Sequence, residues 1–81
     1  MNLADFESKT DLARGKFWQR VIGGFHFYIA INNDYNDYDA YIVHEVTAEN
    51  SKLLFFEPYK TIDLCLQAFN EYIKKNNIKV E

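Results

Sequence analysis

The stretch KFWQRVIGGFHFYIAIN, residues 16–32, decides the fold of this 81-residue chain. From residue 25 to residue 32, large apolar side chains alternate with smaller or more polar ones, which is the period of a β-strand with one buried face. The pair Gly23-Gly24 separates this run from an earlier one that is rich in aromatic and β-branched residues. Glycine adopts positive φ at little cost, so the pair indicates a two-residue turn between antiparallel strands.

A helix is the alternative for the first half of this stretch. It would begin near Ser8, end at Ile22 and use Gly23 as its C-terminal cap. It would also hold Gly15 in its interior, which costs about 1 kcal/mol relative to alanine. The aromatic and β-branched side chains of residues 16–22 prefer a pleated surface, so the pattern favours the hairpin.

The flanking segments predict two helices. Residues 2–13 are expected to form a short N-terminal helix, with Asn2 as its N-cap and Gly15 just past its end. Towards the other end of the chain, Thr61 is a suitable N-cap for a helix whose apolar residues recur at every third or fourth position. One face of this C-terminal helix is therefore expected to pack on the sheet.

Two further strands are predicted between the hairpin and the C-terminal helix. The first covers residues 39–48, and its wetter face is expected to carry Asp39, Tyr41, Val43, Glu45 and Thr47. The second is the apolar run KLLFFE, residues 52–57, which Pro58 is expected to end because proline has no N–H for the sheet ladder. We therefore expect one α+β domain over residues 1–81: a short N-terminal helix, a three- to four-stranded antiparallel meander, and a C-terminal amphipathic helix packed on one sheet face.

The composition indicates a small domain held together by aromatic residues. Hydrophobic residues make up 48% of the chain and aromatic ones 17%, which compensates for the thin stability margin of so short a chain. Cys65 is the single cysteine, so no internal disulfide can form, which fits a reducing compartment. The sequence shows neither a signal-peptide pattern nor an apolar run long enough to span a membrane. We expect a cytoplasmic protein that does not act at a membrane.

Negative charge and tyrosines gather in the middle of the chain. Residues 33–41 read NDYNDYDAY, and no lysine or arginine occurs from Val21 to Ser51, although the net charge is only −3. Asn and Asp are common turn formers, so a solvated hairpin loop is the simplest interpretation. Tyrosines beside carboxylates are also typical of surfaces that bind basic partners. The predicted partner-binding residues are Asp34, Tyr35, Asp37, Tyr38, Asp39, Tyr41, Glu45 and Glu49.

This acidic and aromatic segment predicts a non-enzymatic protein-binding module that occludes a basic site on another protein. A nucleic-acid-handling enzyme or complex is a suitable partner, because arginine binds carboxylates and phosphates alike. In size, acidity and aromatic content the chain resembles the small inhibitors made by phages and mobile elements, such as anti-CRISPR proteins and DNA mimics. The resemblance is one of composition; it implies an inhibitory function and assigns no role to any residue.

Two other functions are compatible with the sequence. The segment before the hairpin interleaves cations with aromatic rings, the combination that single-stranded nucleic-acid binding uses. Its candidate nucleic-acid-binding residues are Arg14, Lys16, Phe17, Trp18 and Arg20. Three cations are few in an acidic chain, so direct binding of nucleic acid is the less favoured alternative. The third interpretation is a self-associating structural subunit, such as a homodimer, that buries its surplus of aromatic residues between protomers.

Residue spacing defines no catalytic or metal-binding motif. A calcium loop that began at Asp34 would have Asn36 and Glu45 at suitable positions, but Tyr38 replaces a ligand and Asp39 replaces the required glycine. The two histidines have no further ligands at a metal-binding spacing, and the cysteine lies among apolar helix residues. The sequence also lacks a glycine-rich phosphate loop and a Ser-His-Asp arrangement. We expect no enzyme, no cofactor and no metal site.

Overall fold

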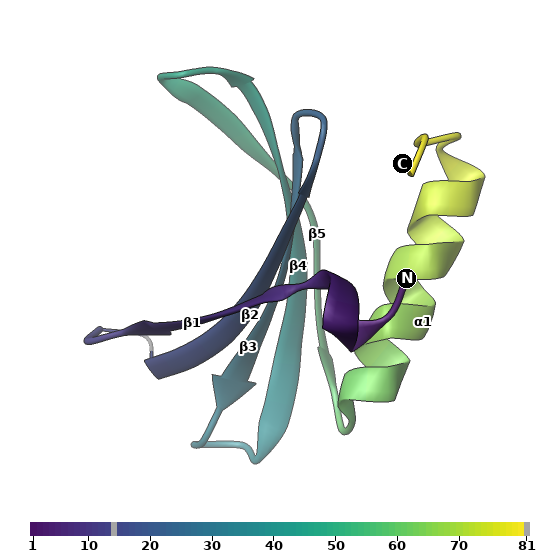
Figure 1. Ribbon diagram of the computed structural model, residues 1–81. Coiled ribbons are helices and arrows are strands. Elements are labelled where there is room, and N and C mark those ends of the chain that lie inside the picture. Colours follow the sequence, from purple (N-terminus) through teal and green to yellow (C-terminus); the bar gives the residue numbers. More distant parts are fainter. Residues whose placement is uncertain (14, 81) are drawn as a thin grey trace.

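The computed structural model describes residues 1–13 and 15–80 (Figure 1). Within these residues the fold is α+β: five antiparallel strands follow one another in chain order across one sheet, and a C-terminal helix lies along one face of that sheet. The elements are η1 (Leu3–Asp5, a 3-10 turn), β1 (Glu7–Asp11), β2 (Gly15–Ile22), β3 (Phe25–Asn32), β4 (Asp37–Thr47), β5 (Asn50–Tyr59) and α1 (Ile62–Lys75). The predicted α+β class is confirmed, and the sheet has five strands rather than three or four.

The glycine pair turns the chain as predicted. β2 and β3 pair in antiparallel register from Ile22 opposite Phe25 to Phe17 opposite Ala30, and Gly23 has a φ of +59° in the turn between them. Positive φ is costly for a residue with a Cβ and cheap for glycine, so this position fixes where the hairpin turns. The alternative helix is excluded, because the residues before the glycines form β2.

The core lies between α1 and one face of the sheet. The fully buried side chains that the sheet contributes are Phe27, Ile29, Ala40 and Ile42. From α1, Phe69 is equally buried and meets the Phe27 ring edge-on at a centroid distance of 5.3 Å. Complete burial of a large apolar side chain contributes about 1.5–3 kcal/mol, so these contacts hold the helix on this face.

α1 begins where the sequence predicts, directly after Thr61. The Thr61 hydroxyl accepts a hydrogen bond from the backbone N–H of Leu64 at 3.2 Å, which satisfies one of the free donors of the first turn. Asp63 lies in that turn, and Lys74 and Lys75 lie in the last one. Each charge is therefore at the helix end whose partial charge it complements. The predicted C-terminal helix is confirmed, with its apolar side on the core.

The predicted N-terminal helix is wrong. Helical structure in residues 1–13 is confined to η1, where the Asp5 carboxylate accepts a hydrogen bond from the backbone N–H of Asn2 at 3.0 Å. Residues 7–11 form the strand β1 instead. Phe6 is the one buried residue of this segment, and its ring stacks on Phe69. So few apolar contacts leave the helix without a face to bury, and backbone pairing of β1 with β2 prevails over a weak local preference.

The prediction that Pro58 ends the last strand is also wrong. β5 continues to Tyr59, and Pro58 lies opposite Asp39 of β4. β5 is an edge strand of the sheet, so the backbone groups on its outer side form no hydrogen bonds to another strand of the described residues. Proline is tolerated in such a strand when the position of its missing N–H faces outward.

A β-bulge interrupts the pairing of β4 with β5. Phe55 and Leu53 pair with consecutive residues of β4, which leaves Leu54 as the extra residue between them. The extra residue shifts the alternation of the strand by one position. As a result Leu53 and Phe56, which are three residues apart, point to the same face of the sheet. That face is the one opposite α1, because Phe56 pairs with Tyr41 rather than with a core residue.

Candidate functional site on the open face of the sheet

The face of the sheet opposite α1 is the candidate site, and we call it the open face. Paired residues of antiparallel strands point to the same side of a sheet, so the register defines its members. On β2 to β5 they are Phe17, Gln19, Val21, His26, Tyr28, Ala30, Asn32, Asp37, Asp39, Tyr41, Val43, Glu45, Ser51, Leu53, Phe56 and Pro58. No helix of residues 1–13 and 15–80 covers this face, and β1 and the β4–β5 hairpin extend away from α1 (Figure 1).

One aromatic ring from each of β2 to β5 forms a row across the open face. This aromatic row consists of Phe17, Tyr28, Tyr41 and Phe56. The Tyr28 and Tyr41 rings stack at a centroid distance of 4.8 Å, and the Tyr41 and Phe56 rings at 6.0 Å. The row is buried at Phe17, which is 8% exposed, and open at Phe56, which is 53% exposed. Its β5 end therefore presents aromatic surface to solvent.

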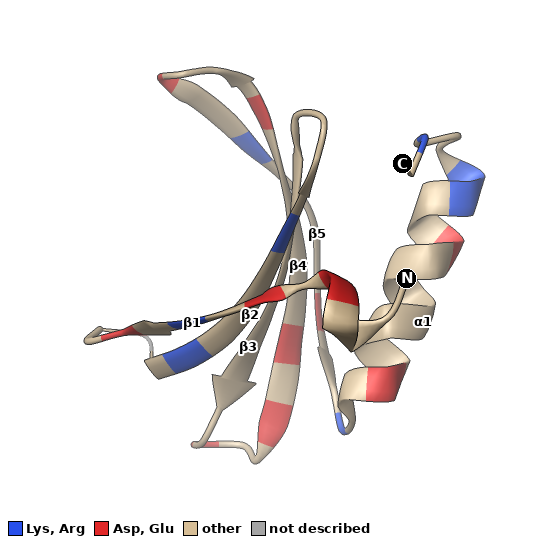
Figure 2. Ribbon diagram, viewed as in Figure 1, with Lys and Arg blue, Asp and Glu red and all other residues tan. Residues whose placement is uncertain are grey.

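Carboxylates of β4 lie on the same face as the aromatic row. They belong to Asp37, Asp39 and Glu45, and Figure 2 shows acidic positions along β4. The Asp39 carboxylate accepts a hydrogen bond from Nδ2 of Asn32 at 3.4 Å. Within the described residues no lysine or arginine pairs with Asp39, so its charge is available to a cation from another molecule.

The fold brings a partner to each of the other two carboxylates. Lys60, in the β5–α1 connection, places Nζ 2.6 Å from the Asp37 carboxylate, and Nε2 of His26 lies 2.9 Å from the Glu45 carboxylate. These partners are distant from the carboxylates in the sequence and close to them in space. The Lys60 side chain is 75% exposed, whereas that of Asp37 is 16% exposed and its Oδ1 is buried, so this ion pair is only partly open to solvent.

His26 belongs to a polar cluster that the sequence analysis did not identify. Nε2 of Gln19 donates to the Tyr28 hydroxyl at 3.1 Å and lies 3.4 Å from Nδ1 of His26. A hollow of about 260 Å³ lies beside the cluster, and Glu45 and Glu49 are among the residues that line it. The alternation along residues 25–32 places His26 and Tyr28 on one side, but the contact with Gln19 follows only from the register of β2 against β3.

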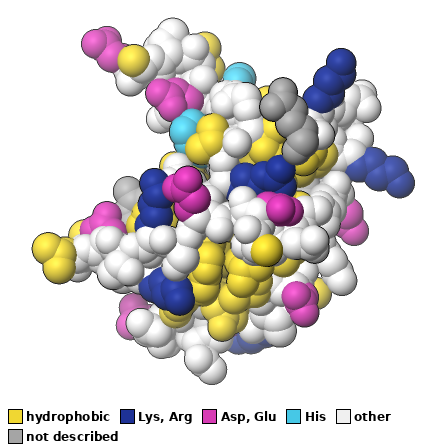
Figure 3. Space-filling view, viewed as in Figure 1, with side chains coloured by type: hydrophobic (Ala, Val, Ile, Leu, Met, Phe, Trp, Pro, Cys, Tyr) yellow, Lys and Arg dark blue, Asp and Glu magenta, His cyan; other side chains and the backbone are white. Residues whose placement is uncertain are grey.

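The structure brings together half of the predicted partner-binding residues. Those on the open face are Asp37, Asp39, Tyr41 and Glu45. Asp34 and Tyr35 lie in the exposed β3–β4 turn, and Glu49 lies in the β4–β5 turn at the other end of β4. Figure 3 shows the β4–β5 hairpin projecting from the body of the molecule. Tyr38 points to the α1 side, where it is half-buried and packs against the core, so it does not belong to this surface.

The predicted nucleic-acid-binding residues do not form one surface. Lys16, Trp18 and Arg20 point to the α1 side of β2, whereas Phe17 points to the open face. Nζ of Lys16 lies 5.1 Å from the centroid of the Trp18 ring, and Nη1 of Arg20 lies 3.5 Å from a carboxylate oxygen of η1. Both cations therefore have partners within the chain. Arg14 lies outside the described residues.

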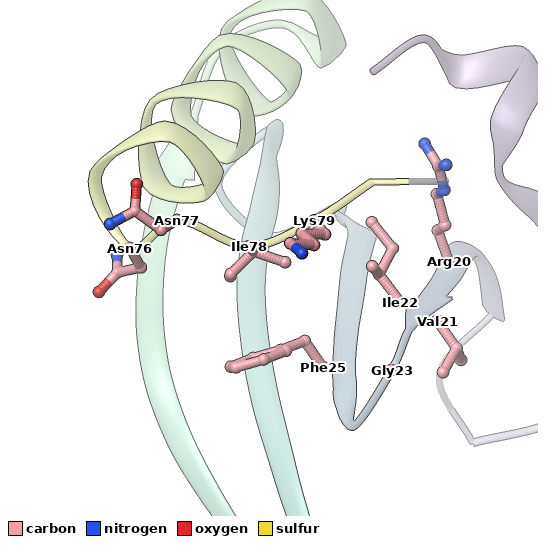
Figure 4. Close-up of a pocket in the computed structure, with 9 residues that line it drawn as sticks. All are labelled: Arg20, Val21, Ile22, Gly23, Phe25, Asn76, Asn77, Ile78 and Lys79. Carbon is pink, nitrogen blue, oxygen red and sulfur yellow. The ribbon is translucent and has the colours of Figure 1, made fainter.

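Another hollow lies on the α1 side, between the β2–β3 hairpin and the segment that follows α1 (Figure 4). It has a volume of about 770 Å³; Ile22, Phe25 and Ile78 supply apolar lining, and Arg20 and Lys79 are its cations. Arg20 already has a carboxylate partner, and the described residues place no unsatisfied buried polar atom in the hollow. It therefore defines no particular ligand.

The described part of the chain offers no cluster of side chains for a metal ion, since no three His, Cys, Asp or Glu side chains there are placed to hold one. Burial raises the pKa of the Cys65 thiol to about 11, which keeps it protonated and weakly nucleophilic. None of the described helices is long and apolar enough to cross a membrane. No protein-family model, curated protein or solved structure matches the chain.

Proposed function

We propose that the chain is a non-enzymatic binding module whose open face docks on a basic surface of another protein and occludes it. The observation that carries this proposal is that Asp39 and the aromatic row lie side by side on a face that no described helix covers. Asp39 and Tyr41 are two residues apart on one strand face, about 7 Å. A carboxylate and a ring at this spacing suit one arginine, whose guanidinium bonds to the first and stacks on the second.

The charge of the open face favours a basic protein over a nucleic acid. The carboxylates of β4 repel phosphate groups, and the cations of β2 lie on the other side of the sheet. Asp37 already has Lys60 as its partner, so Asp39 is the carboxylate that we expect an incoming cation to bind. Electrostatic complementarity of this kind accelerates association and selects partners by charge.

Within this proposal the partner is a nucleic-acid-handling protein. A basic groove that binds phosphates also accepts carboxylates, because both are oxyanions that arginine binds with two hydrogen bonds. The module then acts in the cytoplasm as an inhibitor of the kind that phages and mobile elements make, anti-CRISPR-like or DNA-mimicking. Its mechanism is occlusion by charge and shape, and it needs no cofactor.

Titration with a short oligoarginine peptide tests the proposed surface. We expect binding that weakens at least tenfold between about 0.05 and 0.3 M salt. Asp39→Lys should weaken it at least tenfold, or about 1.4 kcal/mol, and Tyr41→Ala should weaken it through the lost stacking. Glu71→Lys is the matched control, because it makes the same charge change at an exposed position of α1. Equal losses in Asp39→Lys and Glu71→Lys would mean that net charge alone binds the peptide, which contradicts the proposal.

A gel-shift experiment separates this proposal from the nucleic-acid alternative. At low salt we expect no shift of single-stranded RNA or DNA by the wild-type protein, because the cations of β2 have partners within the chain. A shift that is lost on replacement of Lys16 and Arg20 by glutamine would contradict the proposal and favour direct binding of nucleic acid.

A further inference from the structure

The outer edge of β5 is a feature separate from the open-face carboxylates. β5 is the last strand in the sheet order, so its outer side pairs with no strand of the described residues. The strand runs from Asn50 to Tyr59, and such an edge presents backbone donors and acceptors that invite another strand. Leu53 and Phe56 on this strand are 57% and 53% exposed. A long edge with exposed apolar side chains is suited to strand addition.

The sequence of this edge is complementary to itself. Residues 52–57 read KLLFFE. If a second copy runs antiparallel and the two runs are centred on each other, Lys52 of one copy lies opposite Glu57 of the other, and Leu53 lies opposite Phe56. The two-fold axis repeats both contacts at the other end of the run. Any shift of the register separates both pairs of opposite charges, so the charges select this register.

The faces of the sheet agree with this register. Opposite residues of an antiparallel pair must point to the same face. Leu53 and Phe56 both lie on the open face, because the β-bulge at Leu54 separates them. Lys52 and Glu57 pair with residues of β4 that point to the α1 side. Each contact between the two copies therefore joins side chains on one side of the sheet.

We propose that two copies of the chain pair through β5 into a continuous antiparallel sheet of twice five strands. Lys52 and Glu57 make no ion pair with the described residues, so both charges are available to the second copy. Opposite-charge and apolar cross-strand pairs each contribute about 0.2–1 kcal/mol, and the symmetry supplies two of each. The backbone hydrogen bonds between the two β5 strands add to these.

Pairing stops at two copies. The other edge of the sheet, β1, is short, exposed and charged, with Glu7, Lys9 and Asp11 among its residues, which is how proteins protect an edge from further pairing. In the proposed register Pro58 lies opposite Ser51 of the second copy, near the end of the paired segment, so its missing N–H leaves the central bonds intact. The assembly is therefore a closed dimer rather than a fibre.

Sedimentation analysis from micromolar to millimolar concentration tests the dimer. The wild-type mass should rise with concentration from the 9.6 kDa of one chain to twice that value and no further. Lys52→Glu sets two carboxylates opposite each other at both ends of the run, and Glu57→Lys does the same with two ammonium groups. Each should raise the dissociation constant at least tenfold, or about 1.4 kcal/mol.

The charge swap is the decisive variant. Lys52→Glu combined with Glu57→Lys restores opposite charges across the dimer axis, so the dissociation constant should return to within about threefold of the wild-type value. Glu71→Lys on α1 should leave it unchanged, and circular dichroism checks that each variant is folded. A wild-type chain that stays monomeric at millimolar concentration overturns the proposal. So do assemblies larger than a dimer, or a swap that does not restore pairing.

Discussion

Replacing Phe69 with alanine tests the contact that determines which face of the sheet is open. Phe69 is fully buried, and its ring centroid lies 5.3 Å from that of Phe27 on the sheet and 6.1 Å from that of Phe6 in the N-terminal segment. A change from phenylalanine to alanine in a core costs about 3–5 kcal/mol. At roughly 0.05–0.15 kcal/mol per residue, the whole domain has about 4–12 kcal/mol. The substitution is therefore expected to remove a large part of the free energy of unfolding.

Urea unfolding, followed by far-UV circular dichroism and by the fluorescence of Trp18, measures this loss. With an m value of about 1 kcal/mol per molar urea, the midpoint should fall by about 3 M or more. Leu64→Ala is the control on the same helix; Leu64 is 40% exposed, so its truncation should cost less than about 1 kcal/mol. A loss below about 1.5 kcal/mol for Phe69→Ala, or equal losses for the two variants, would show that α1 is not anchored on this face and would refute the reasoning.

Three further predictions concern single positions. Thr61→Ala removes the hydroxyl that accepts from Leu64 N–H and should cost about 1 kcal/mol in urea unfolding. Gly23→Ala places a Cβ at a φ of +59°, so it should cost about 1–2 kcal/mol and lower the melting temperature by about 4–8 °C per kcal/mol in calorimetry. Burial raises the pKa of Cys65 from 9.0 to about 11, so the folded state holds the thiol proton more tightly. The free energy of unfolding should therefore fall by up to about 3 kcal/mol as the pH rises from about 9 to 11, and Cys65→Ala should flatten that part of the curve in urea titrations.

Local signals made much of the fold predictable. The turn at Gly23-Gly24 needs positive φ, and the alternation in residues 25–32 follows from burial of one strand face. Both features depend only on residues that are close together in the sequence, so a local pattern predicts them. The same holds for Thr61 as the cap of α1. β1 was not predictable in this way, because its residues are mostly exposed and it is held by backbone pairing with β2. Pro58 was expected to end β5, but the strand continues to Tyr59. The reason is that β5 lies at the edge of the sheet, a position that the sequence does not reveal.

The alternation of β4 is the part of the candidate site that the sequence predicts, because it determines which β4 side chains share a face. The expected start of this strand at Asp39 lies two residues too late, since β4 begins at Asp37. Alternation from Asp37 assigns Tyr38 to the core side, where the structure has it. The pairing of Asp37 with Lys60 joins residues far apart in the chain and depends on the register of β5 against β4. No pattern in the sequence encodes that register.

The two proposed surfaces would act together without depending on each other. Pairing through β5 places the open faces of both copies on one side of a continuous sheet, because Leu53 and Phe56 point to that side in each. A partner with two basic sites would then be held twice, and its second contact would form at the effective concentration that the dimer sets. Lys52→Glu should therefore weaken binding to such a partner while leaving the affinity for a short oligoarginine peptide unchanged. Asp39→Lys should weaken binding to such a partner and to the peptide, and it should leave the dimer intact. The two variants therefore distinguish a failure of the proposed open-face site from a failure of the proposed dimer.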